Sequence, residues 1–135
     1  MEPMQKRNCG TAVDFILRIG LVIAFLYASI AQMLHPEAWI MWFPPWLGNI
    51  ADLTILLYVF SIYELALGLW LLCDKKTFYA AVLAAITMFL IVISNLPALD
   101  LVFRDIPILF TALALAVLHY HRRENNRHTE TIKRR

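Results

Sequence analysis

The 135-residue sequence has few charged residues, only four glycines and only two cysteines. Charged residues make up 16% and hydrophobic residues 61%, a balance that excludes an ordinary soluble domain of this size. The glycines form no phosphate-binding loop. Cys9 and Cys73 form no CxxC pair, which excludes a dithiol redox motif and, in a reducing compartment, argues against a structural disulfide. The sequence therefore predicts a membrane protein.

Four apolar stretches are each close to the roughly 20 residues needed to cross the hydrocarbon core. They are Thr11–Leu34, Leu53–Cys73, Thr77–Leu96 and Leu101–Tyr120. The first is too long for a cleavable signal peptide and lacks a small-residue cleavage pattern, so we expect it to be retained. The fold predicted is an all-α integral membrane four-helix bundle over residues 11–121. Residues 1–10 precede it, and a basic tail, residues 122–135, follows it and is expected to be frayed from about Glu124.

Positive charge is concentrated on one side of the predicted bundle. Ten of the twelve Lys and Arg residues lie there: Lys6, Arg7, Lys75, Lys76, Arg122, Arg123, Arg127, Lys133, Arg134 and Arg135. By the positive-inside rule both termini of this multi-pass membrane protein are cytoplasmic. A basic tail directly after a span is more typical of contact with anionic lipid than of nucleic-acid binding, which we do not expect.

The segment after the first span is rich in aromatic residues. Trp39, Trp42, Phe43 and Trp46 surround Pro44 and Pro45, and this pattern predicts a short interfacial helix from Pro36 followed by a turn. The aromatic side chains could form a membrane anchor or a lid over a ligand. Further along the chain, Asp52 is a candidate N-cap for the second span, and residues 74–76 predict a tight turn that makes the second and third spans antiparallel neighbours.

Glu64 is the most unusual residue, because it lies near the middle of the second apolar stretch. An ionised carboxylate there costs several kcal/mol unless it is paired, so an acid at this depth indicates a functional site. The alternative is a glutamate that only fixes helix packing. Ser61, Glu64 and Gly68 share one helical face, and Gly68 permits the close approach of a neighbouring backbone.

The first span also carries a polar face. Its members recur at three- and four-residue steps: Asp14, Arg18, Val22, Phe25, Ser29 and Gln32. Counted from the predicted cytoplasmic ends, Arg18 and Glu64 differ in depth by only about 3 Å at the helical rise. We therefore expect an Arg18–Glu64 ion pair, with Asp14 competing for Arg18 or lying among the headgroups.

A second polar group is predicted near the outer surface. It comprises Gln32, His35, Asn95, Arg104 and Asp105. This group could be a solvated rim or the polar mouth of a ligand pocket that leads down to Glu64. In the pocket interpretation the ligand-binding residues are Gln32, Asn95, Arg104, Asp105, Trp39, Trp42 and Ser61, and the catalytic residues are Glu64 and Arg18.

These motifs together resemble the DoxX family of small four-span membrane proteins. The matching features are Arg18 in the first span, Glu64 followed by Gly68 in YELALGLWLL, the DKK turn, and Arg104-Asp105 in FRDIPILF. The resemblance extends over about residues 11–121. It implies a four-helix bundle associated with redox or thiol-stress chemistry, in a family whose members include the membrane subunit of thiosulfate:quinone oxidoreductase. Together with the loop charges, the resemblance also implies a location in the cell inner membrane. This chain differs from a typical member in the Ala28-Ser29-Ile30 stretch and in its tryptophan-rich first loop.

The leading functional hypothesis is a quinone- or lipid-pocket subunit of a membrane redox system. A quinone site needs an apolar slot and a desolvated carboxyl that can take up a proton, which Glu64 would provide with Arg18 as its partner. Electrons would come from the substrate or a soluble redox partner. The histidines are not placed to give two haem ligands at one depth, and we expect no haem or metal. The alternatives are a small proton-coupled transporter, with a homo-oligomer possible, and a non-catalytic scaffold for a soluble partner.

Overall fold

The computed structural model describes residues 2–133, and these residues are helical apart from short connections. Four long helices are joined by shorter ones. In chain order the helices are α1 (Glu2–Leu34), α2 (Pro36–Ile40), the 3-10 helix η1 (Pro45–Asn49), α3 (Leu53–Leu72), α4 (Thr77–Ser94), the 3-10 helix η2 (Leu96–Ala98), α5 (Leu99–Val102) and α6 (Asp105–Lys133). The predicted four-helix architecture is confirmed.

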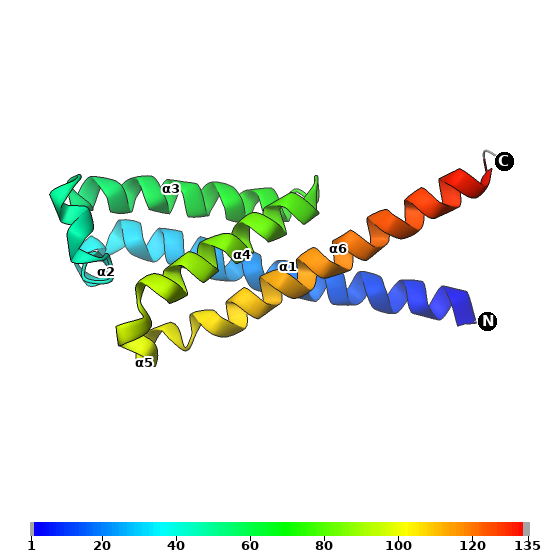
Figure 1. Cartoon of the computed structure of the whole chain (residues 1–135), viewed down its shortest axis with the longest axis horizontal. Helices are drawn as coiled ribbons and strands as arrows, with labels where there is room; N and C mark the ends of the chain where they lie inside the picture. The colour runs from blue at the N-terminus through cyan, green and yellow to red at the C-terminus, as the bar shows by residue number, and fades with distance from the viewer. Residues whose placement is uncertain (1, 134–135) are drawn as a thin grey trace.

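The long helices pack mainly as two pairs, α1 with α3 and α4 with α6. Smaller interfaces, α1 with α6 and α3 with α4, join the pairs into one bundle. Both chain ends project from the same end of the bundle, beyond the connection between α3 and α4 (Figure 1). We call this the turn end. The opposite end, which carries α2, η1, η2 and α5, is called the loop end.

Three helical segments are long and apolar enough to cross a membrane: Gly10–Leu34, Leu53–Leu72 and Thr77–Ser94. The fourth long helix, α6, is apolar only from Ile106 to Leu118, between Asp105 and His119. At the helical rise this stretch is about 20 Å long, shorter than the hydrocarbon core. It packs along α4 and α1, so the bundle is a helical membrane bundle with one short member.

The predicted local signals at helix ends are confirmed. A short helix begins at Pro36, and Pro44 and Pro45 lead into η1. Asp52 caps α3, because its Oδ1 accepts from the backbone N–H groups of Thr54 at 2.8 Å and Ile55 at 3.4 Å. These two bonds hold the pKa of Asp52 below its usual value, since they stabilise the carboxylate.

The turn between α3 and α4 is as tight as predicted. Asp74 and Lys76 both have a φ of 55°, in the left-handed region that few residues other than glycine adopt. Proline at position 107 lies in the first turn of α6, where its missing N–H costs no helical hydrogen bond. Residues 99–104, at the start of the predicted fourth span, instead form α5 and a break, so that span begins at Asp105 rather than Leu101.

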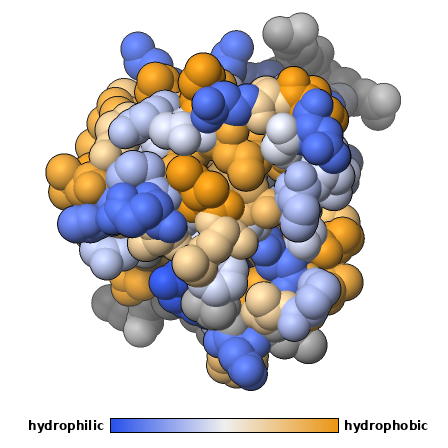
Figure 2. Space-filling model, turned by 90° about the vertical axis from the view of Figure 1, so that its left-hand side faces the viewer, coloured by the Kyte–Doolittle hydropathy of each residue, from blue (hydrophilic) through white to orange (hydrophobic). Residues whose placement is uncertain are grey.

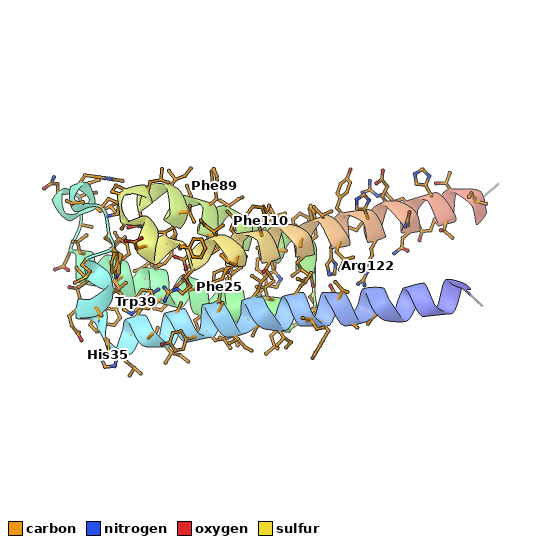
Figure 3. All side chains as sticks on the ribbon, turned by 90° about the horizontal axis from the view of Figure 1, so that it is seen from below. Phe25, His35, Trp39, Phe89, Phe110 and Arg122 are labelled. Carbon is orange, nitrogen blue, oxygen red and sulfur yellow. The ribbon has the colours of Figure 1, made fainter. Side chains whose placement is uncertain are left out.

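The two ends of the chain differ from expectation. α1 is helical from Glu2, well before the predicted start of the first span, and α6 is helical to Lys133, so the expectation of a frayed tail was wrong. The extensions support each other: Arg122 Nη2 donates to the Gly10 carbonyl oxygen at 2.6 Å. In Figure 3, Arg122 points from α6 toward α1 in this region.

Small residues allow the helices to pack closely. On α4, Ala80, Ala81 and Ala84 are fully buried, and Ala112 of α6 is buried against the same core. Gly68 plays this role between α3 and α1. A Cβ atom added at Gly68 would lie 3.3 Å from Leu26 Cδ2 and 3.4 Å from Phe25 Cβ, closer than ordinary contacts between carbon atoms.

We predict that Gly68→Val lowers the free energy of unfolding by about 1–3 kcal/mol, because it overpacks the α1–α3 interface. Gly68→Ala should have a smaller effect of the same sign. Gly20→Ala is the matched control, because a Cβ at Gly20 would meet no atom within 4 Å. It should leave stability unchanged or raise it. Thermal unfolding in detergent micelles measures the stability of all three variants. Equal changes in stability for Gly68→Ala and Gly20→Ala would contradict the close packing at Gly68.

Candidate functional site

A buried polar cluster joins α1 and α3 inside the bundle. Glu64 is 1% exposed, Gln32 2% and Ser61 0%. Gln32 Nε2 donates to Glu64 Oε2 at 2.6 Å. The Ser61 hydroxyl lies 2.8 Å from Gln32 Oε1 and 2.8 Å from the Leu57 carbonyl oxygen of its own helix, so its one proton is shared between two acceptors. Gln32 therefore bridges the two polar side chains of α3.

Helical spacing brings these side chains together. Ser61, Glu64 and Gly68 are buried on one face of α3, as predicted, and Gly68 brings that face against Phe25 and Leu26. The predicted face of α1 is confirmed as well: Val22, Phe25, Ser29 and Gln32 are buried, as is Asp14. Ser29 is satisfied within its own helix, since its hydroxyl donates to the Leu26 carbonyl oxygen at 3.0 Å.

The predicted Arg18–Glu64 ion pair is wrong. Arg18 pairs with Asp74 in the turn between α3 and α4. Among the side chains that the structure describes, no Lys, Arg or His forms an ion pair with Glu64, and its hydrogen-bond partner is the neutral Gln32. Asp105 is close enough to interact electrostatically with Glu64, but this group is another acid.

The register of the helices explains this error. α1 and α3 run antiparallel with Phe25 and Leu26 beside Gly68, and Gln32 beside Ser61 and Glu64. Continuing this register toward the turn end places Arg18 at the level where α3 stops. The depth of Arg18 was predicted by counting from Thr11 as the start of the span, but α1 begins at Glu2 and extends well past the turn. Arg18 therefore lies at the end of the bundle rather than beside Glu64.

A second polar group lies at the turn end, between α1 and α6, where Asp14 is buried and its two partners are partly exposed. His119 Nε2 is 2.6 Å from Asp14 Oδ1, and Arg122 Nη1 is 3.7 Å from Asp14 Oδ2. The prediction that Asp14 competes for Arg18 or lies among the headgroups missed this partnership. Opposite charges on α1 and α6 were visible in the sequence, but the long antiparallel contact that brings them together was not.

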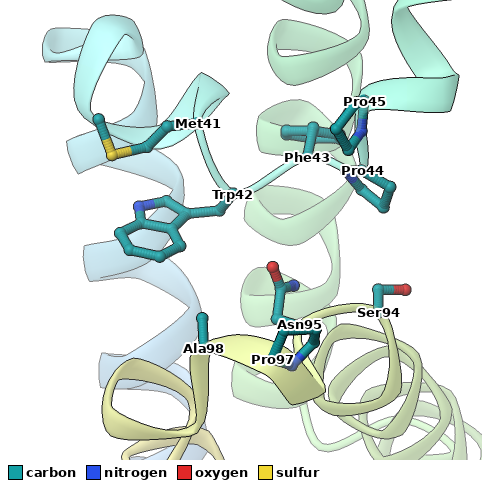
Figure 4. A pocket seen from close by; sticks show the side chains of 9 residues that line it. All are labelled: Met41, Trp42, Phe43, Pro44, Pro45, Ser94, Asn95, Pro97 and Ala98. Atoms are coloured by element: carbon teal, nitrogen blue, oxygen red, sulfur yellow. The ribbon is translucent and has the colours of Figure 1, made fainter.

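At the loop end, two of the predicted ligand-binding residues, Trp42 and Asn95, line a small cavity. Its volume is about 170 Å³, and its walls are the segment from Met41 to Pro45 on one side and the region around Asn95 on the other. Trp42 lies on one side of it and Asn95, whose amide points toward Phe43 and Pro44, on the other (Figure 4). Both side chains are anchored: Trp42 Nε1 donates to the Ala38 carbonyl oxygen at 2.9 Å and Asn95 Nδ2 to the Ile91 carbonyl oxygen at 3.0 Å.

The other predicted mouth residues lie apart from this cavity. The Arg104 guanidinium lies 6.0 Å from the centre of the Trp39 ring, and its Nε is 3.5 Å from Asp105 Oδ1. His35 is exposed and lies near Glu37. Gln32 belongs to the buried cluster and not to the mouth. Figure 2 shows the loop end with hydrophobic and hydrophilic side chains intermixed across its face.

An aromatic series runs from this cavity along α3. Phe43, which lines the cavity, contacts Phe60 edge-to-face with ring centres 6.2 Å apart, and Phe60 lies 6.0 Å from Tyr63. Tyr63 precedes Glu64 and forms a 2.7 Å hydrogen bond with Thr87 of α4. This series was not predicted from the sequence. Among the described residues, no group of three His, Cys, Asp or Glu side chains is arranged to hold a metal ion.

The family comparison covers most of these features. A family model, DoxX, matches residues 13–95, which is more than half of the chain and extends from α1 to the end of α4. This chain belongs to the DoxX family. The match includes Glu64, Gln32 and Ser61, together with both walls of the loop-end cavity up to Asn95. No curated protein and no solved structure matches the chain.

The buried cluster of this DoxX protein lies within the residues that match the family model. Four other polar residues lie beyond the match: Arg104, Asp105, His119 and Arg122. Chemically, the cluster is a carboxyl group in an apolar surrounding with a neutral amide and a hydroxyl as partners. Such a group can change its protonation state without breaking an ion pair.

We predict that Gln32→Leu lowers the free energy of unfolding by about 1–3 kcal/mol, because Glu64 and Ser61 lose a partner inside the bundle. Adding Glu64→Met should restore part of this loss, since an apolar pair leaves no carboxyl group unsatisfied. Ser29→Ala is the control and should have little effect, because Ser29 bonds only its own helix. If the free energies of unfolding lost in Gln32→Leu and in Glu64→Met alone simply add in the double variant, the two residues are not coupled.

Proposed function

We propose that this DoxX protein binds a quinone, or a lipid of similar shape, in the membrane and exchanges a proton with it through Glu64. The observation that carries the proposal is that Glu64 is buried in a membrane-spanning helix with Gln32, a neutral residue, as its partner. A cation beside it would hold a glutamate in its charged form, whereas neutral partners allow Glu64 to be charged or protonated.

The partners of Glu64 suit both of its protonation states. As a carboxylate it accepts from Gln32 Nε2, while Gln32 Oε1 accepts from Ser61. If Glu64 takes up a proton, rotation of the Gln32 amide lets its oxygen accept from the new O–H and its NH₂ donate to Ser61 Oγ. The cluster can therefore gain or lose a proton while each side chain keeps a hydrogen bond.

The loop-end cavity is the proposed entry point for the ligand. At about 170 Å³ it has room for a ring but not for a whole quinone, so the apolar tail would remain along the lipid-facing surface. Trp42 and Phe43 offer aromatic faces to a ring, and Asn95 offers a polar group. The series Phe43, Phe60 and Tyr63 links this entry to the level of Glu64.

Arg18 has no part in this proposal, because its partner is Asp74. Arg104 and Asp105 are proposed to shape the loop end together with Trp39. The electrons for a redox reaction would come from the substrate or from a soluble partner protein. The exposed helical extension of α6, with Arg127, is the proposed contact for such a partner.

A binding titration tests the proposal. In lipid nanodiscs, we expect both decylubiquinone and its reduced form to quench tryptophan fluorescence saturably. The ratio of their two affinities should change with pH. In Glu64→Gln the pH dependence should disappear, because the proton-exchanging group is gone. Glu64→Ala should weaken binding of the reduced form by about tenfold or more, the value of a lost hydrogen bond in an apolar site. Glu37→Gln, an exposed acid at the loop end, is the matched control.

The outcomes separate the proposal from its alternatives. Identical affinities and pH dependence in the native chain and Glu64→Gln would refute proton exchange with a bound quinone. Proton-coupled uptake of a solute into proteoliposomes, lost in Glu64→Gln and without quinone binding, would identify a transporter instead. Recruitment of a soluble partner that survives Glu64→Gln but is lost on removal of residues 124–135 would identify a scaffold.

We further propose that the turn end faces the cytoplasm of a cell with an inner membrane. The support is the charge distribution, since most Lys and Arg residues lie beside or beyond the turn between α3 and α4. We predict that green fluorescent protein fused after residue 135 is fluorescent and that alkaline phosphatase at the same place is inactive. Moving the phosphatase into the loop end, after Gly48, should make it active. The opposite pattern would reverse the orientation.

A further inference from the structure

A cavity with an excess of positive charge lies at the turn end, between α4 and α6. Its volume is about 270 Å³, and Lys76, Phe78 and Tyr79 line it from the turn and α4, with His119 and Arg123 from α6. This cavity lies at the opposite end of the bundle from the proposed quinone entry, and the proposed function does not use it.

The acid in this cavity is already paired, whereas its strongest cations are not. Asp74 binds Arg18 and accepts a hydrogen bond from the Thr77 hydroxyl at 3.0 Å. His119 contacts Asp14. Among the described residues, neither Lys76 nor Arg123 forms an ion pair with a carboxylate. The cavity is therefore suited to an anion.

Aromatic rings hold Arg123 in position. Its guanidinium carbon lies 5.5 Å from the centre of the Phe78 ring and 5.1 Å from that of Tyr79. A cation stacked on aromatic faces keeps N–H donors along its edge. These donors, together with the Lys76 ammonium group, match the oxygen atoms of a phosphate group.

The cavity also lies at the depth where lipid headgroups are expected. The apolar stretch of α6 ends at Leu118, and α1 and α6 leave the bundle at this level (Figure 1). Exposed aromatic side chains with polar tips, Trp70, Tyr79 and Tyr120, mark the same level, as in the aromatic belt of membrane proteins. Trp70 Nε1 donates to the Lys75 carbonyl oxygen at 2.8 Å, which ties this belt to the turn.

From this arrangement we propose that the cavity binds the phosphate group of an anionic phospholipid. Lys76 and Arg123 contact the phosphate oxygens, and the acyl chains extend along the apolar surface of the bundle. The bound lipid joins the turn to α6, beside the direct contact between Phe78 and Tyr120, whose ring centres are 6.3 Å apart.

Native mass spectrometry of the delipidated full-length protein tests the proposal. We expect phosphatidylglycerol to bind saturably at one site per chain, and phosphatidylcholine to bind more weakly. Lys76→Asn and Arg123→Gln should each weaken phosphatidylglycerol binding by about fivefold, the value of one cation near a lipid surface. Asparagine suits position 76 because it adopts the left-handed backbone region readily, so the turn is kept.

Matched variants distinguish a built site from general attraction. Lys75→Asn removes the same charge from the same turn but outside the cavity, and should leave the affinity unchanged. Arg123→Lys keeps the positive charge and should retain most of the phosphatidylglycerol binding. An unchanged thermal midpoint of unfolding checks that this variant is folded. Equal weakening by Lys75→Asn and Lys76→Asn would overturn the proposal, as would an unchanged affinity in both Lys76→Asn and Arg123→Gln. Displacement of the lipid by millimolar inorganic phosphate would show that the site serves a soluble phosphate compound instead.

Discussion

The structure depends on one constraint, that polar groups in hydrocarbon must find their partners within the protein. Gln32 meets this need at the centre of the bundle, since its amide donates to Glu64 and accepts from Ser61. The three side chains fix the register of α1 against α3, and Gly68 allows the backbones to come close enough for the bonds to form. The same contacts that join the helices also leave a carboxyl group buried without a cation, so packing and the proposed chemistry arise from one cluster.

The ends of the bundle are organised differently from its centre. At the turn end, Arg18 pairs with Asp74, and Asp14 contacts His119 and lies near Arg122. Lys76 and Arg123, at the same end, pair with none of the described carboxylates. At the loop end, proline and aromatic residues form a cavity with little charge. An apolar ligand would therefore be admitted at the loop end and an anionic headgroup held at the turn end, and Glu64 lies between these two regions.

Much of this arrangement could be predicted from the sequence, because it is local. Helical spacing identified the buried faces of α1 and α3, and proline and aspartate marked α2 and the cap at Asp52. Contacts between helices were harder to predict, because they depend on where each helix ends relative to its neighbour. Arg18 was assigned to Glu64 because hydropathy alone placed the start of its span at Thr11, and the pairing of His119 with Asp14 could not be predicted without the extensions of α1 and α6.

The proposed function requires that Glu64 changes its protonation state when a ligand binds. Infrared difference spectroscopy observes such a change directly. We predict that adding a soluble quinone to the protein in lipid produces a change in the carbonyl band of a protonated carboxyl group. This change should be absent from Glu64→Gln and shifted in Gln32→Leu, which removes the hydrogen-bond partner of that carboxyl. A spectrum without a carboxyl change, or with the same change in Glu64→Gln, would contradict the account.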